Sequence, residues 1–180
     1  VRLGLISSNR GFMSVDPLVS RVCADGNLLR VLTYGRGRRL GPTIVFLHEG
    51  LGSIGQWKHF PDNLARAAGC SALVYERQGH GGSDPLTSKR KPDFMESEAE
   101  HVLPELLNSL GLDKVFLYGH SDGGSIALLF AARFPARTLG VVAEAAHVFV
   151  EEESLSGVRA TVERFEASDM KNRLSVYHGN

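Results

Sequence analysis

The chain has 180 residues, and its content of 43% hydrophobic and 22% charged residues is typical of a globular protein with one sizeable core. Its 20 basic and 20 acidic residues cancel, so we expect neither nucleic acid nor a membrane among its partners, and no apolar run is long enough to span a bilayer. The segment Val1–Arg10 lacks the features of a signal peptide, and Cys23 and Cys70, expected to be buried reduced thiols, are too few for a disulfide framework. Together these features predict a cytoplasmic protein.

The first half of the chain has the pattern of a hairpin followed by alternating strands and a helix. Apolar runs at 19–24 and 28–34 flank Asp25-Gly26-Asn27, a typical hairpin turn sequence. The continuous apolar runs at 43–47 and 71–75 predict strands that are buried on both faces of a parallel sheet. Between these two strands, four residues recur at helical spacing: Trp57, Phe60, Leu64 and Ala68.

The second half continues the alternation. An apolar stripe over 99–110 predicts a helix that ends at Gly111, and Pro104 predicts a kink or a late start in it. The other expected elements are a strand at 114–118, a helix at 126–134 closed by Pro135, a strand at 139–143, a helix with Val158, Val162 and Phe165 on one face, and a further helix with Leu174 and Tyr177. This order predicts an α/β protein with an N-terminal hairpin, a mainly parallel sheet and helices on both faces. The loops that follow its strands should meet at the carboxyl edge of the sheet, where such folds bind ligands.

The segment Gly119–Gly124 reads Gly-His-Ser-Asp-Gly-Gly and lies between an expected strand and an expected helix. This arrangement is typical of a nucleophile elbow, in which a serine on a strained turn is exposed above the sheet. A Cβ two residues before or after the serine would collide with the backbone, so glycine is needed at both places. Asp122 is an alternative nucleophile, but only Ser121 has glycine on both sides, and we therefore predict Ser121 as the nucleophile.

A serine that attacks a carbonyl needs N–H donors for the oxyanion that forms. In an elbow one donor is the N–H of the residue after the serine, here Asp122, and the second comes from a loop after an earlier strand. That loop is His48–Ser53, and within it we predict Gly50 as the second donor.

Four motifs in this order resemble the α/β-hydrolase family, in its branch with a serine nucleophile, over about residues 17–150. They are the elbow, the loop Phe46–Ser53 with Glu49 in place of the usual glycine, the segment Tyr75–Asp84, which is similar to the family's Asp-x-Arg-Gly-x-Gly-x-Ser loop, and the segment Ala131–Arg137. The resemblance implies a hydrolase core over residues 1–149 and the start of a helical lid over 150–180. It also implies a serine hydrolase that acts through an acyl-enzyme on an ester, lactone, amide or related carbonyl compound, with a small-molecule substrate and neither a metal nor an organic cofactor.

In similar proteins the triad acid and histidine follow later strands, and we expect both to lie beyond Asn180, with the sheet incomplete at its C-terminal end. We therefore expect little turnover from these 180 residues alone. Some members place the acid after the strand that follows the elbow, which makes Glu144 a tentative acid. Among the histidines, His80 and His147 follow strands on the ligand-binding edge and are the candidates for an internal base. We expect His48 and His120 to shape the oxyanion loop.

Two other classes of function remain open. Gly50–Gly55 matches G-x-G-x-x-G after a strand, and Glu76 ends the next strand, which outlines a dinucleotide site of an NAD-dependent oxidoreductase. Pro61 argues against this reading, because it would lie well inside the helix that must begin at the glycines. A catalytically incomplete or non-catalytic ligand-binding member of the fold is the other alternative. The sequence leaves the oligomeric state open.

Overall fold

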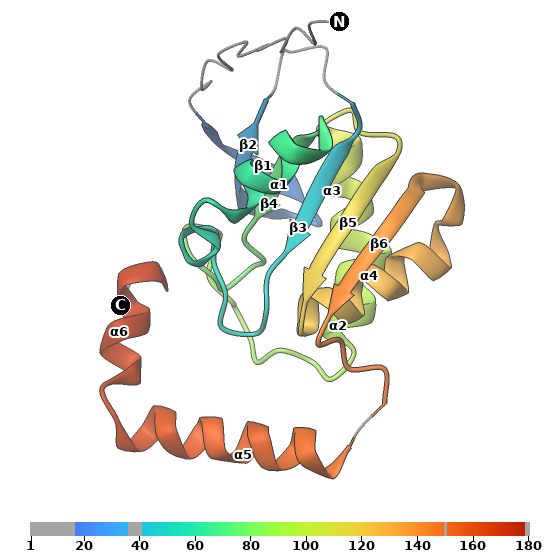
Figure 1. Ribbon diagram of the computed structural model, residues 1–180. Coiled ribbons are helices and arrows are strands. Elements are labelled where there is room, and N and C mark those ends of the chain that lie inside the picture. Colours follow the sequence, from blue (N-terminus) through green and yellow to red (C-terminus); the bar gives the residue numbers. More distant parts are fainter. Residues whose placement is uncertain (1–16, 36–40, 150, 179–180) are drawn as a thin grey trace, which may run out of the picture.

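The computed structural model describes residues 17–35, 41–149 and 151–178, which form a six-stranded sheet with helices on both faces (Figure 1). Its elements are β1 (Leu18–Ala24), β2 (Asn27–Tyr34), β3 (Thr43–Leu47), the 3-10 helix η1 (Ile54–Trp57), α1 (Phe60–Ala68), β4 (Ser71–Tyr75), α2 (Phe94–Ser97), the π-helical turn η2 (Glu98–Val102), α3 (Leu103–Ser109), β5 (Val115–His120), α4 (Asp122–Arg133), the 3-10 turn η3 (Pro135–Arg137), β6 (Thr138–Glu144), α5 (Glu152–Ala167) and α6 (Met170–His178). The strand order is β1-β2-β4-β3-β5-β6. Strands β4, β3, β5 and β6 are parallel, whereas β1 and β2 pair antiparallel with their neighbours, so the predicted hairpin and parallel sheet are confirmed.

The hairpin closes through a tight turn at Asp25 and Gly26, whose φ angles are 48° and 72°. Positive φ at both central residues matches the right-handed twist of the flanking strands, and glycine reaches it without steric cost. The Asp25-Gly26 pair therefore fixes the register in which Ala24 faces Asn27.

Residues along the central strands alternate between two apolar layers. In β3, Val45 and Leu47 belong to the core under α3 and α4, while Ile44 and Phe46 face the core under α1. Strand β4 alternates in the same way. Both faces of these strands are buried, which is why their sequences are continuous apolar runs.

The helix before β5 contains a π-helical turn, η2, directly before Pro104 near the start of α3. Proline has no N–H and its ring collides with the carbonyl of a regular helix, so a wider turn accommodates it. We expected a kink or a late start at Pro104, and the structure shows a local widening of the helix instead. Ala99, Leu103 and Leu106 remain buried in one core.

Two local expectations are corrected. The helix after β3 begins at Phe60, with Pro61 in its first turn, and Trp57 lies in the preceding η1. Cys70 is buried, but Cys23 is exposed. Cys23 lies on β1 between Ala24 and Val22, which both face the core, so alternation along the strand turns the thiol outward.

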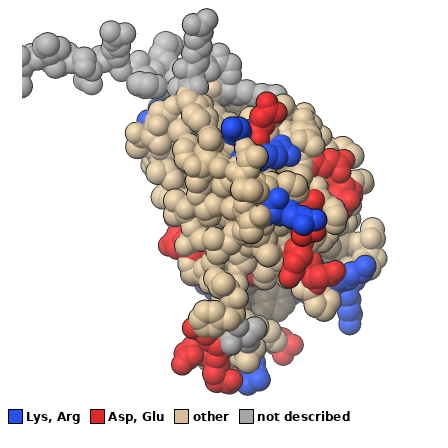
Figure 2. Space-filling view, turned by 90° about the vertical axis from the view of Figure 1, so that its right-hand side faces the viewer, with Lys and Arg blue, Asp and Glu red and all other residues tan. Residues whose placement is uncertain are grey.

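Helices α5 and α6 extend away from the sheet, and α6 returns toward the loop that follows β3 (Figure 1). No residue of α5 is buried. Figure 2 shows that uncharged side chains cover much of the face that carries β6, with basic and acidic groups interspersed at its margin. Within the described ranges, no helix is long and apolar enough to cross a membrane.

Candidate active site

The loops that follow β3, β4, β5 and β6 meet at one edge of the sheet. Ser121 lies there, between β5 and α4, with φ 53° and ψ −119°. A non-glycine residue rarely takes positive φ, and this strained turn exposes the serine at the top of the sheet. The Ser121 N–H donates to the Glu144 carbonyl oxygen at 2.8 Å, which ties the elbow to the end of β6.

The two glycines around the serine are required by close backbone contacts. A Cβ on Gly119 would lie 2.1 Å from the Gly123 carbonyl oxygen, and one on Gly123 would lie 2.0 Å from the Leu47 carbonyl oxygen. No side chain fits at such distances without moving backbone. The predicted need for glycine at both positions is confirmed.

The structure brings His147 to Ser121. The Ser121 Oγ lies 3.3 Å from Nε2 of His147, which follows β6. Ser125, one turn after the nucleophile on α4, donates its hydroxyl to the His147 carbonyl oxygen at 3.0 Å and accepts the His147 N–H at 2.9 Å. These two bonds hold the backbone of His147 beside the elbow.

The carboxylate of Glu144 lies at the end of β6 but binds a tyrosine. The Tyr118 hydroxyl donates to Glu144 Oε2 at 2.6 Å. Burial, together with this bond and the Glu144 charge, raises the pKa of Tyr118 to about 12. Among the described residues no histidine is hydrogen-bonded to Glu144, so its role as triad acid stays a prediction.

The candidate oxyanion loop lies against the elbow. A Cβ on Gly50 would lie 3.0 Å from the Asp122 Oδ2, so the two residues predicted as N–H donors are neighbours. Asp122 is the first residue of α4, where backbone N–H groups are unpaired within the helix. The carboxylate of Glu49, which replaces the usual glycine, accepts the Leu51 N–H and so helps to fold the loop.

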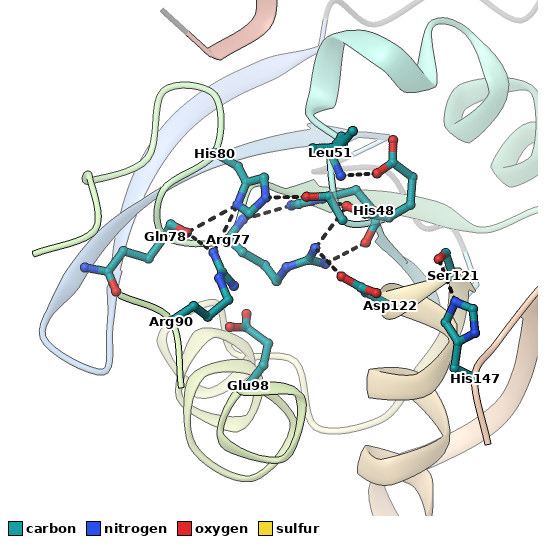
Figure 3. A network of polar contacts seen from close by, with 12 residues as sticks. His48, Leu51, Arg77, Gln78, His80, Arg90, Glu98, Ser121, Asp122 and His147 are labelled. Carbon is teal, nitrogen blue, oxygen red and sulfur yellow. Dashed lines mark hydrogen bonds and ion pairs between the residues drawn. The ribbon is translucent and has the colours of Figure 1, made fainter. Parts of the chain in front are cut away.

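Arg77 connects the oxyanion loop with the elbow (Figure 3). Its guanidinium donates to the carbonyl oxygens of His48 at 2.5 Å and Glu49 at 3.0 Å, and it lies 3.9 Å from the Asp122 carboxylate. The side chain is 1% exposed, and these contacts replace the solvation of its two terminal nitrogens, while its Nε has no hydrogen-bond partner among the described residues. Arg77 thereby fixes the position of the loop that carries Gly50.

Two histidines in this network are held neutral. The Nε2 atom of His48 accepts the backbone N–H of Arg77. Burial, and to a lesser extent the charge of Arg77, holds the pKa of His48 well below its ordinary value. Burial and the charge of Arg77 likewise lower the pKa of His80 to about 4. His80 Nε2 lies 3.0 Å from the Gly50 carbonyl oxygen, so this ring supports the loop and is not paired with Ser121. Of the two internal candidates, the structure places His147 at the serine.

The dinucleotide reading does not match the geometry. The last of these glycines, Gly55, lies inside the 3-10 helix η1, and α1 begins only at Phe60, so no α-helix N-terminus lies at the glycines to receive a pyrophosphate. Glu76, the acid expected to bind a ribose, is 1% exposed. Its carboxylate instead accepts the N–H groups of Ile54 at 2.9 Å and Gly82 at 2.8 Å.

Helix α6 closes a cleft over the oxyanion loop. The His178 ring accepts the Gly81 N–H at 3.0 Å through Nδ1 and lies 2.9 Å from the Leu51 carbonyl oxygen through Nε2. A cleft of about 530 Å³ lies between α6 and the loops at Gly50 and His80. Within residues 17–35, 41–149 and 151–178, no group of three or more His, Cys, Asp or Glu side chains is arranged to hold a metal ion.

The sequence interpretation missed Arg77 and Ser125. Arg77 is the first cation after the apolar run of β4, and a charge at that place is a sequence signal for a buried, paired ion. Ser125 carries no such signal, because its link to His147 depends on how α4 and β6 pack.

Comparison with known families gives a match at residues 42–167 to the family described as alpha/beta hydrolase fold. The 2-hydroxy-6-oxo-6-phenylhexa-2,4-dienoate hydrolase of Burkholderia cepacia is 30% identical over 104 residues, which are 57% of this chain and 35% of that protein. The 2-succinyl-6-hydroxy-2,4-cyclohexadiene-1-carboxylate synthase of Salmonella paratyphi C is 29% identical over 123 residues, 68% of this chain and 46% of that protein.

Among solved structures, Est816, described as an N-acyl homoserine lactone degrading enzyme, is similar with a TM-score of 0.57 and 27% identity. The match covers 68% of this chain and 43% of that one. This chain therefore spans less than half the length of each of these three proteins.

Proposed function

Because this chain belongs to the alpha/beta hydrolase fold family, we propose that it carries the nucleophile and oxyanion site of a serine hydrolase. The substrate class is an ester, lactone, amide or related carbonyl compound. The observation that carries the proposal is the strained Ser121, whose hydroxyl lies 3.3 Å from a histidine nitrogen.

In the first step Ser121 Oγ attacks the carbonyl carbon of the substrate while its proton passes to Nε2 of His147. The carbonyl oxygen becomes an oxyanion, and the N–H groups of Gly50 and Asp122 stabilise it. The leaving group departs with the proton from His147 as the bond to the carbonyl carbon breaks, which leaves an acyl-serine. Water then gives a proton to His147 Nε2 and attacks the acyl carbon, the bond from that carbon to Ser121 Oγ breaks, and His147 returns the proton to the serine as the acid leaves.

The candidate triad acid, Glu144, is hydrogen-bonded to Tyr118 and not to a histidine. For Glu144 to serve, its carboxylate has to exchange the Tyr118 hydroxyl for a histidine ring. In the described part of the chain, His147 has no carboxylate within hydrogen-bond distance. We therefore propose that this chain is acylated but turns over slowly, since loss of a triad acid costs about 10⁴-fold in rate.

Helices α5 and α6 fit the start of a lid over the core of residues 1–149. The support is the cleft under α6, which is lined by Gly50 of the candidate oxyanion loop. A substrate held in that cleft contacts both the lid and the loop.

A fluorophosphonate probe tests the proposal directly, because it reacts with activated serines and needs no knowledge of the substrate. We expect labelling of one site, mapped by peptide mass analysis to Ser121, and none in Ser121→Ala. The variant Ser156→Ala, on the exposed face of α5, is the matched control and should label normally. Labelling that persists in Ser121→Ala, or no labelling of the unaltered chain, would contradict the proposal.

A further inference from the structure

Helix α6 is joined to the core through His178. No residue of α5 or α6 is buried. Among the residues that the structure describes, the two hydrogen bonds of His178 are the only hydrogen bonds or ion pairs between residues 151–178 and the preceding part of the chain. The Tyr177 ring adds a close contact, since a Cβ on Gly55 would lie 3.0 Å from it. The position of α6 therefore depends to a large extent on His178.

The two hydrogen bonds of His178 connect three segments that lie far apart in the sequence. Nδ1 accepts the N–H of Gly81, in the loop after β4, at 3.0 Å. Nε2 lies 2.9 Å from the carbonyl oxygen of Leu51, which follows Gly50 in the oxyanion loop. The same ring thus holds α6 over the loop that carries a predicted oxyanion donor, with the cleft of about 530 Å³ between them.

The partners of His178 determine which of its nitrogens carries a proton. A backbone N–H only donates and a carbonyl oxygen only accepts, so Nδ1 has to be unprotonated and Nε2 has to carry the proton. The docked ring is therefore neutral. A second proton, on Nδ1, would face the Gly81 N–H, so two donors would meet and this hydrogen bond would be lost. Histidine is the side chain that ordinarily changes its charge between about pH 5 and pH 8.

Groups that carry or can acquire positive charge surround this ring. The centroid of the His80 ring lies 5.7 Å from that of His178, and α5 contributes only the uncharged Phe165 to the cleft, which no acidic residue lines. The groups of this kind that face the ring, its cleft or the neighbouring His80 are His48, Arg77, His80, Arg90 and Lys171. A proton on His178 would therefore add a charge to a region that already holds cations, which disfavours it.

The acids of the surrounding segments are engaged with other groups. The Glu76 carboxylate fills the space beside Gly81, but its two oxygens accept backbone N–H groups of other residues. Glu49 accepts a backbone N–H within its own loop, and Asp122 lies 3.9 Å from Arg77. None of the described carboxylates is hydrogen-bonded to His178. A protonated ring therefore has no acid partner that would compensate for the lost bond to Gly81.

We propose that His178 is a positioning residue that holds α6 over the candidate oxyanion loop as a neutral ring and releases the helix when the ring binds a proton. The helix then covers the loop near neutral pH and leaves it in mild acid. An effect on catalysis rests on the proposed function, whereas docking of α6 does not involve Ser121.

Hydrogen exchange of the backbone amides, followed by mass spectrometry, tests the proposal. Helix α6 has nine residues, and an isolated helix of this length is marginal in water, so its amides should exchange once it is released. We expect the protection factors of residues 170–178, which are corrected for the intrinsic effect of pH, to fall at least about fivefold from pH 7.5 to pH 5.5, as the loss of one hydrogen bond predicts. Amides of β3 in the same samples report any change in global stability.

Variants at one position separate hydrogen bonding from titration. His178→Phe keeps a ring but loses both bonds, and its α6 should be weakly protected at both pH values. His178→Asn, whose carboxamide oxygen can accept the Gly81 N–H but does not titrate, should show no pH dependence. The matched control His101→Gln, at an exposed position of η2, should keep the fall seen in the unaltered chain.

Equal protection of α6 at both pH values in the unaltered chain, or a fall of the same size in His178→Asn, would overturn the proposal. Nitrogen NMR of the unaltered chain at pH 7.5 provides a second measurement that needs no variant, and a proton on Nδ1 of His178 would overturn it as well. A chain with pH-dependent exchange of α6 that no fluorophosphonate labels would contradict the proposed function and keep this role of His178. Labelling of Ser121 without pH-dependent exchange would do the reverse.

Discussion

Ser125 and His147 are joined by two hydrogen bonds, in which the serine hydroxyl donates to the histidine carbonyl at 3.0 Å and accepts the histidine N–H at 2.9 Å. Ser125 is 5% exposed, so water competes little for these bonds. Because α4 begins at the elbow, the same helix that positions Ser121 also holds the backbone of its histidine neighbour. The 3.3 Å distance between Ser121 Oγ and His147 Nε2 follows from this shared anchor.

Replacement of His147 tests its role as the base. In His147→Gln the proton of Ser121 loses its acceptor, and we expect fluorophosphonate labelling of Ser121 to slow by about 10²–10⁴-fold. The rate of labelling is measured by quenched time points on a gel. His101→Gln, at an exposed position of η2, serves as the control and should label at the original rate. Equal rates in both variants would exclude His147 as the base.

Alanine at Gly123 should be far more harmful than alanine at another helical glycine. The new Cβ would lie 2.0 Å from the Leu47 carbonyl oxygen, so backbone has to move, at a cost of about 3 kcal/mol or more. In Gly157→Ala, in α5, the new Cβ meets no atom within 4 Å apart from the helix's own nearby backbone, and the change should stabilise the helix by about 0.5–1 kcal/mol. Urea unfolding of both variants measures the difference, and equal stabilities would contradict the elbow geometry.

Stability should fall in mild acid partly through His80. Burial and the charge of Arg77 lower the pKa of His80 to about 4 from its ordinary 6.5, so between these values the unfolded chain binds a proton that the folded chain does not. This contribution is complete above pH 6.5 and is lost as the pH falls toward 4. One proton corresponds to at most about 1.4 kcal/mol per pH unit, and less for a partly exposed ring.

The measurement is urea unfolding of the unaltered chain and of His80→Gln at several pH values from 4 to 7.5. We expect the free energy of unfolding of the unaltered chain to fall more steeply with acidification than that of His80→Gln. The exposed His101→Gln controls for the loss of a histidine as such. Parallel curves for the unaltered chain and His80→Gln would show that this ring does not contribute.

Glu76 is predicted to be a structural acid. In Glu76→Gln the side chain keeps one acceptor oxygen, but its new NH₂ group faces the backbone N–H donor of Ile54 or Gly82. We therefore expect the free energy of unfolding to fall by about 1–3 kcal/mol. Glu100→Gln is the control, because the ion pair of Glu100 with Arg133 is solvent-exposed. Its free energy of unfolding should fall by no more than about 0.5 kcal/mol. Thermal unfolding compares the two. Retention of the unaltered chain on immobilised NAD, lost in Glu76→Gln, would instead revive the dinucleotide reading.

Much of this protein follows from local sequence pattern. The hairpin turn, the buried strands at 43–47 and 71–75, and the elbow around Ser121 were all predicted, because strand periodicity and the need for glycine at fixed offsets act over a few residues. The prediction that Cys23 is buried was wrong. Neighbouring residues of a strand face opposite sides of the sheet, so a shift of one residue along this edge strand changes the side that a cysteine faces.

The tertiary structure decided which distant side chains meet. The sequence could not choose between His80 and His147, because both lie within five residues of the end of a strand at the correct edge. Packing of the loop after β4 against the oxyanion loop commits His80 to the Gly50 carbonyl, while Ser125 turns His147 toward Ser121. A nucleophile turn is encoded within six residues, but its partner depends on contacts between segments more than 20 residues apart, and only the folded chain fixes those.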